Sequence, residues 1–412
     1  MWIPIISNSI EKECISNKIN EIFLSLKERI DYIKNFNFYM GKSGMFLFLI
    51  LYQTLQKKSI SDIKIHDIVS SLIDQASKCT ITNSIDFTYY AELSWFIHFL
   101  SEKGLIDIDS DYFSEINDSL YEGMSLLLER NEYGCINGAI SIALYFYYRY
   151  LAGDESLKTY LNSFVDQLMK NRIENEDSIK WINTIDYGTF EQGYNLGIAH
   201  GHPGILLFFI KLYAADIKTD SIPNAMIKIA NFLLHQKHSL DTHKSFFYDV
   251  CSEKSTSGRD TRLGWCYGDL SVGYSLLMSS QLLRNKCLYE EAMNILIETT
   301  YRKDLKDIGI VDAGLCHGTS GIAHIYDRLY RQTNEQKFKY SALYWYKETI
   351  KMAKYESDYA GYELPYYLSE SEKELKEIHN LSFLTGISGV GLSLCSAIYP
   401  IEPLWDECLL LS

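Results

Sequence analysis

Proline, basic charge and long apolar runs are all scarce in this sequence. Only 6 of the 412 residues are proline, which leaves long stretches able to form uninterrupted helices. The 39 Lys and Arg face 53 Asp and Glu, and a net charge of −14 excludes a bulk nucleic-acid binder, which needs basic surface to displace counterions. The best apolar run, residues 44–52, is about half as long as a bilayer span requires. The sequence therefore predicts no transmembrane segment.

The cysteines do not have the spacing of a secreted disulfide scaffold. There are 9 of them, an odd number scattered through a long chain, which indicates reduced thiols in a cytoplasm. The first residues, MWIPIISNSIEKEC, lack the basic and apolar regions of a signal peptide. With 47% hydrophobic and 22% charged residues, we expect an acidic, cytoplasmic globular protein.

Helical periodicity dominates the chain, whereas strand alternation with hairpin turns is rare. Two stretches, 161–169 and 225–233, repeat apolar residues with the period of one helix face. Those residues are Leu161, Phe164, Val165 and Leu168 in the first stretch and Met226, Ile229, Ala230 and Leu233 in the second. No Ser/Gly/Pro-rich linker interrupts the sequence. We predict an all-α chain that forms one domain over residues 1–412.

A short phrase recurs along the chain: Gly, two residues, Gly or Ser, then an apolar helical stretch. Its leading glycines are Gly41, Gly138, Gly201, Gly268, Gly318 and Gly386. A degenerate copy, with Ala91 and Ser94 in the small-residue slots, would fill the long first gap. Seven units of about 59 residues each suit two helices and a loop. Because small residues at helix starts let backbones approach closely, the repeat favours an α/α toroid of seven helical hairpins, with inner and outer rings, over an open solenoid.

The residues just before the leading glycines would lie at one end of such a toroid. Cys266 and Cys316 each precede a leading glycine by two residues, and His317 precedes it by one. A lone cysteine is usually a core residue, so the argument rests on two of them occupying the same slot at helix N-termini, where the dipole favours thiolate. A Cys₂His set leaves a fourth tetrahedral position open, as in catalytic zinc sites. The spacing therefore favours one zinc ion per chain.

Three phrases, GIAHGHPG (197–204), RLGWCYGD (262–269) and LCHGTSG (315–321), resemble the lanthionine synthetase C family in order and separation. The resemblance covers essentially the whole chain. It implies an α/α toroid with a zinc at the end of the barrel, and a cyclase that joins peptide Cys thiols to dehydroalanine or dehydrobutyrine in thioether rings. Matched by motif, the metal ligands would be Cys266, Cys316 and His317, the acid/base group His200, and the surrounding active-site residues Arg262 and Tyr267.

The resemblance also implies partners: a dehydrated precursor peptide, a dehydratase and an export transporter, the last of which would bring the protein near the membrane. One departure affects proton transfer. Where the family usually has an Asp four residues before the third-repeat glycine, this chain has Gly134, and the nearest acid is Glu132. Either Glu132 serves instead or the carboxylate is missing. The departure supports the alternative of a non-catalytic peptide- or thiol-binding scaffold on the same toroid.

The chemistry of thiol addition assigns tasks to these side chains. Attack on the β-carbon moves negative charge onto an amide oxygen, which Arg262 could stabilise, and His200 or Tyr267 could supply the α-carbon proton. His202 and His324 lie near the same end. His202 is expected at most to line the site, and His324 to be a core residue or to support a residue of the site. Asp269 and Asp312 would orient metal ligands or cap helices.

Other enzymes that use α/α barrels fit the sequence less well. Terpene chemistry needs Asp-rich runs and no Asp-Asp pair occurs here, while glycoside hydrolases need two facing carboxylates and no thiolates. Residues 355–380, which have weak helical pattern, are expected to form an exposed loop at the catalytic end.

Overall fold

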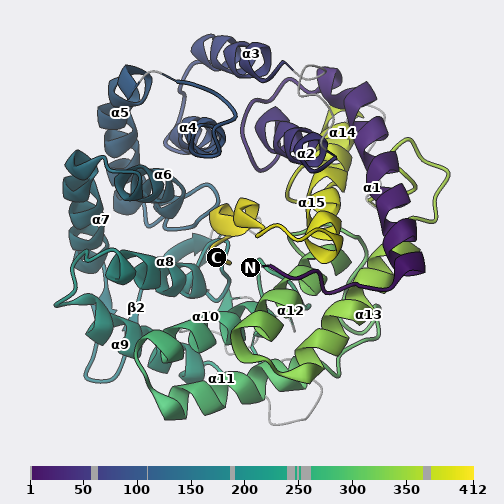
Figure 1. Cartoon of the computed structure of the whole chain (residues 1–412). Helices are drawn as coiled ribbons and strands as arrows, with labels where there is room; N and C mark the ends of the chain where they lie inside the picture. The colour runs from purple at the N-terminus through teal and green to yellow at the C-terminus, as the bar shows by residue number, and fades with distance from the viewer. Residues whose placement is uncertain are drawn as a thin grey trace. The chain divides into compact units, whose positions relative to one another are not determined.

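The computed structural model describes residues 2–56, 64–108, 110–185, 191–238, 246–247, 250–251, 261–364 and 373–412. Within these residues the chain is mostly helical (Figure 1). Its contacts define two compact units. Unit 1 comprises Met1–Thr80, Phe99–Ile106 and Leu305–Trp405, and unit 2 comprises Ile81–His98, Asp107–Asp304 and Asp406–Ser412. Of the helices in the described ranges, none combines the length and apolar character needed to span a membrane.

Unit 1 is built from helices near both ends of the sequence. Helix α15 packs against α1, α2 and α12, and α12 pairs with α13. The bounds are α1 Ser9–Arg29, α2 Lys42–Leu55, α3 Ile65–Ser77, α12 Thr319–Thr333, α13 Gln336–Met352, α14 Lys373–Leu381 and α15 Ile387–Ile398, with a 3₁₀ turn at Ile30–Tyr32.

Unit 2 repeats a helical hairpin. Helices α6, α8 and α10 contact one another in succession, and each packs against the helix that follows it, α7, α9 or α11 (Figure 1). The helix bounds are α5 Ser110–Glu129, α6 Ala139–Leu151, α7 Lys158–Lys170, α8 His202–Ala214, α9 Ile222–His235, α10 Asp269–Leu282 and α11 Lys286–Thr299. Helix α4, Asp86–Glu102, belongs to this unit as far as His98.

Short strands flank the α8–α9 hairpin: β1 to β4 precede α8, and β5 follows α9. Strands β1 (Ile173–Glu174) and β2 (Ile179–Lys180) pair antiparallel. Strand β4 (Glu191–Asn195) lies between β3 (Asn183–Ile185) and β5 (Val250–Cys251), with Asn183 opposite Gly193 and Tyr194 opposite Cys251. The last residue of β4, Asn195, lies beside the segment that carries Cys266, because its side-chain amide is 3.0 Å from the hydroxyl of Tyr267.

Burial distinguishes the two kinds of helix in each hairpin. Helix α8 is apolar and buried on nearly all sides, as expected for a helix surrounded by others. The partner helices bury one face only. The faces predicted for α7 and α9 are confirmed, because all eight of the named apolar residues are buried.

All six leading glycines are the residues that cap helix N-termini, of α2, α6, α8, α10, α12 and α15. The reason for glycine differs from the predicted one. A Cβ at Gly201 would lie 2.1 Å from the carbonyl oxygen of Asn195, and one at Gly268 would lie 2.3 Å from that of Arg262. The preceding loop folds back on the first turn of the helix. Glycine is therefore needed to make room for this loop, and not for a neighbouring helix.

The degenerate repeat copy does not begin a helix in the way that the other six copies do. Helix α4 begins at Asp86, so Ala91 and Ser94 lie inside it. Asn83 and Asp86 cap it reciprocally: the Asn83 side chain accepts from the Asp86 N–H at 3.3 Å, and the Asp86 carboxylate accepts from the Asn83 N–H at 3.1 Å. Side-chain capping replaces the glycine turn in this repeat.

The predicted loop at 355–380 falls partly outside the described residues, which omit 365–372. Before that gap Tyr359, Tyr362 and Leu364 are buried. After it the chain forms α14.

Candidate metal and thiol site

Cys266 lies in a tightly held segment at the start of α10. From Thr261 to Leu270 only Arg262 and Tyr267 are partly exposed, whereas Cys266 itself is 5% exposed. The neighbouring Trp265 donates its indole N–H to the carbonyl of Leu409 at 2.8 Å. The segment therefore fixes its buried residues by packing and leaves the Arg262 and Tyr267 side chains accessible.

Asp269 is a buried anchor for this segment rather than an exposed cap. Its carboxylate accepts from the backbone N–H groups of Phe246 and Phe247, each at 3.1 Å, and from Arg302 at 2.9 Å. Arg302 also donates to the carbonyl of Thr261 at 2.6 Å. Of the two roles expected for Asp269, exposed capping of the helix is wrong, because Asp269 is 0% exposed and its carboxylate joins three stretches of chain.

Cys316 and His317 precede α12 in the same way. The backbone N–H of Cys316 donates to Leu384 at 2.9 Å, and its side chain is buried. Asp312, also buried, accepts the N–H of Gly314 at 2.8 Å with Oδ1, while its Oδ2 lies 3.2 Å from Nε2 of His317. A carboxylate in this position orients a histidine and leaves Nδ1 as the nitrogen for a metal.

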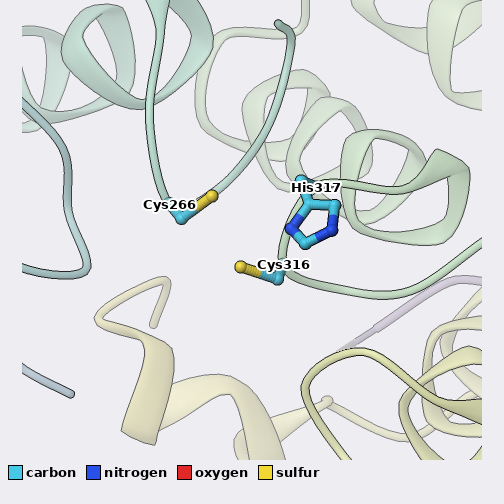
Figure 2. Close-up of side chains that lie close together, drawn as sticks. All are labelled: Cys266, Cys316 and His317. Atoms are coloured by element: carbon cyan, nitrogen blue, oxygen red, sulfur yellow. The ribbon is translucent and has the colours of Figure 1, made fainter. Parts of the chain in front are cut away.

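The ligand atoms of Cys266, Cys316 and His317 all lie within 4.8 Å of one another. Figure 2 shows the three side chains directed toward one another. Within the described ranges this is the one cluster of His, Cys or acidic groups with metal-ligand spacing. Two sulfurs and one imidazole nitrogen suit zinc, which accepts both ligand types in tetrahedral sites.

His200 lies half-buried just before α8. Burial lowers its pKa, opposed by the nearby Cys266 and by a hydrogen bond to the backbone of Ile136. Its own carbonyl accepts from the Asn183 side chain at 3.1 Å, and its ring lies 6.4 Å from the ring of Tyr267. An imidazole held in this way has one nitrogen bonded to the backbone and the other available for proton transfer.

Position 134, which is glycine here, has no room for a side chain in this structure. A Cβ on Gly134 would lie 2.7 Å from the carbonyl oxygen of Ala199 and 3.0 Å from Cα of His200. Glu132 is half-buried, and desolvation raises its pKa, opposed by Arg130 and Ser84; the Ser84 hydroxyl lies 3.4 Å away. The hydrogen bond of Glu132 thus goes to Ser84.

The other histidines divide into core residues and one that sequence reasoning missed. His202 is fully buried, accepts the N–H of Trp181 at 3.0 Å and bonds the carbonyl of Asn195 at 2.8 Å; burial lowers its pKa to about 4. His324 is buried against Trp405, as expected of a core residue. His379 on α14 was missed: burial and the nearby His317 lower its pKa. Its signal was weak, because it lies in a segment without clear helical pattern.

The helical architecture and the Cys₂His cluster define the class of protein. The chain belongs to the family described as lanthionine synthetase C-like protein, whose sequence model matches residues 32–410. Among curated relatives, the nisin biosynthesis protein NisC of Lactococcus lactis subsp. lactis is 25% identical over 438 residues, covering 98% of this chain and 96% of the relative. A solved structure of a nisin cyclase superposes with a TM-score of 0.72 at 20% identity, covering 96% of this chain and 97% of that one. The predicted family and the all-α toroid fold class are confirmed.

Proposed function

We propose that this chain is a zinc-dependent lanthipeptide cyclase. It would add Cys thiols of a dehydrated precursor peptide to dehydroalanine or dehydrobutyrine, forming lanthionine and methyllanthionine rings. The observation that carries the proposal is the convergence of Cys266, Cys316 and His317 within 4.8 Å. Family membership and the similarity to a nisin biosynthesis protein support the same activity.

The residues around the cluster fit a resident zinc ion. Cys266, Cys316 and His317 would hold it, with the buried Asp312 beside Nε2 of His317 orienting the ring. Three protein ligands leave a coordination position for the incoming sulfur. Zinc bound there would lower the pKa of the peptide thiol so that it reacts as thiolate.

The remaining chemistry falls to protein side chains. The sulfur forms a bond to the β-carbon as the carbon–carbon π bond breaks, and negative charge develops on the neighbouring amide oxygen. The partly exposed Arg262 would stabilise that oxygen. The ring nitrogen of His200 that does not bond Ile136 would accept the thiol proton, and a proton is delivered to the α-carbon. The net result adds S–H across the double bond.

This role implies partners by chemistry. A dehydratase must supply the dehydro residues, and a transporter would remove the cyclised peptide.

The test is to add dehydrated precursor peptide to purified, zinc-loaded protein and count thiols. We expect one zinc per chain and a steady loss of peptide thiol, with no change in peptide mass, because addition is an isomerisation. A tightly bound peptide that keeps all its thiols would contradict the proposal and favour the non-catalytic scaffold.

A further inference from the structure

The side chain of Tyr267 contacts Asn195, the last residue of β4, and Gly197, which follows the strand. A Cβ on Gly197 would lie 2.0 Å from the carbonyl oxygen of Cys266 and 2.7 Å from the ring of Tyr267. Only glycine lets the segment approach this closely. The side-chain amide nitrogen of Asn195 lies 3.0 Å from the hydroxyl of Tyr267. Contacts on both the ring and the hydroxyl therefore fix the position of this phenol.

The direction of that hydrogen bond follows from the other end of the same amide. Oδ1 of Asn195 accepts the N–H of Gly197 at 3.0 Å, so the atom facing Tyr267 is the nitrogen. An amide nitrogen only donates, and the Tyr267 oxygen must therefore accept. The hydroxyl proton of a phenol lies near the ring plane, so it points away from Asn195.

The rest of Asn195 is equally fixed. It is 5% exposed, its carbonyl accepts from His202 at 2.8 Å, and its own N–H lies 3.4 Å from the Asn183 side chain. Asn183 in turn holds the carbonyl of His200. Two asparagines on paired strands thus position both candidate proton-transfer side chains, Tyr267 and His200.

We propose that Asn195 is a positioning residue that makes Tyr267 the proton donor of the reaction, an inference that rests on the proposed cyclase function. Tyr267 gives its O–H proton to the α-carbon of the former dehydro residue. The thiol proton accepted by His200 then returns to the Tyr267 oxygen, directly or through water, across rings whose centres are 6.4 Å apart. No other reactant is needed, since the proton lost by sulfur balances the one gained by carbon.

Asn195→Asp tests the direction of the bond with almost no change of shape. Oδ1 still accepts from Gly197, but the second oxygen now accepts the Tyr267 proton and turns it away from the substrate. We expect kcat to fall about a hundredfold, near the loss in Tyr267→Phe, with KM and zinc content close to parental values. Since Asn195 acts through Tyr267, Asn195→Asp should cost nothing further in a Tyr267→Phe background.

Asn117→Asp is the matched control. Asn117 is also a buried asparagine beside a tyrosine, but there Tyr145 already donates to it at 2.9 Å, so an added oxygen does not reverse the bond. This variant should keep parental kcat. Should Asn195→Asp fail to fold, Asn195→Ala is the substitute, because it removes the donor without offering an acceptor. We expect it to lower kcat several-fold in protein that keeps Tyr267 and to have no effect in Tyr267→Phe.

A second readout does not depend on turnover. In protein labelled with ¹³Cζ-tyrosine, the Tyr267 resonance, assigned by its loss in Tyr267→Phe, should shift in Asn195→Asp and stay in place in Asn117→Asp. Three results would overturn the inference. One is a parental kcat in Asn195→Asp, and another is an unshifted Tyr267 resonance. The third is that Asn195→Asp lowers kcat by the same factor whether or not the Tyr267 hydroxyl is present. Inactivity of the parent protein would instead count against the proposed function.

Discussion

Replacing Cys316 by alanine is expected to abolish zinc binding and ring closure together. Cys316 supplies one of two sulfurs in a three-ligand cluster, and its removal leaves Cys266 and His317 as the remaining ligands. Loss of metal removes the charge that lowers the thiol pKa, an effect of several kcal/mol, so the rate should fall about a thousandfold or more. Zinc content by atomic emission and thiol loss on dehydrated peptide measure the two effects.

Cys395→Ala is the matched control for this experiment. Cys395 is also buried, in α15, and burial raises the pKa of its thiol well above the usual range. Such a cysteine is a small core residue, and we expect its replacement to leave zinc content and rate nearly unchanged. A Cys316→Ala protein that closed rings at the parental rate would show that the chemistry does not depend on this cluster.

The second large effect is expected at His200. His200→Asn keeps a polar side chain of smaller size but removes the nitrogen that accepts the thiol proton. General acid–base groups contribute about 10²–10⁴-fold, so kcat should fall within that range. Zinc should stay bound, because His200 is not among the three clustered ligands. This combination separates proton transfer from metal binding.

His235→Asn provides the comparison, since His235 is the exposed last residue of α9 and exposed substitutions have small effects. Its kcat should remain within about twofold of the parent. Full activity in His200→Asn, or loss of zinc along with activity, would refute the assignment of His200 as the proton acceptor.

The parts of this site that sequence could predict are those carried by the repeat. Gly268 and Gly318 mark equivalent helix starts, so Cys266 and Cys316 occupy the same slot and approach each other despite 50 residues of separation in the leading glycines. Predicting this shared position required only the periodic glycine motif. The buried faces of α7 and α9 could likewise be predicted from the sequence, because burial of one helix face makes apolar residues recur with a 3.6-residue period.

Other contacts of the site could not be predicted from the sequence, because short polar segments without a periodic pattern make them. Strand β4 (EQGYN) has no apolar alternation, yet it supplies Asn195, which meets Tyr267 72 residues away in sequence. Arg302 and Asp269 form a buried pair that neither residue's local pattern predicts. In α4 the Asn83–Asp86 cap takes the place of the glycine turn found in the other repeats, since side-chain capping satisfies a helix terminus as well as a glycine turn does.

The most direct test of the account is zinc K-edge X-ray absorption of the loaded protein, recorded with and without a thiol-bearing peptide. Cys266, Cys316 and His317 predict two sulfurs, one imidazole nitrogen and one light atom around zinc in the resting protein. Addition of the peptide should raise the sulfur count to three as its thiolate enters the fourth position. A resting count other than two, or a count that does not change with peptide, would contradict the claim that this cluster binds and activates the substrate thiol.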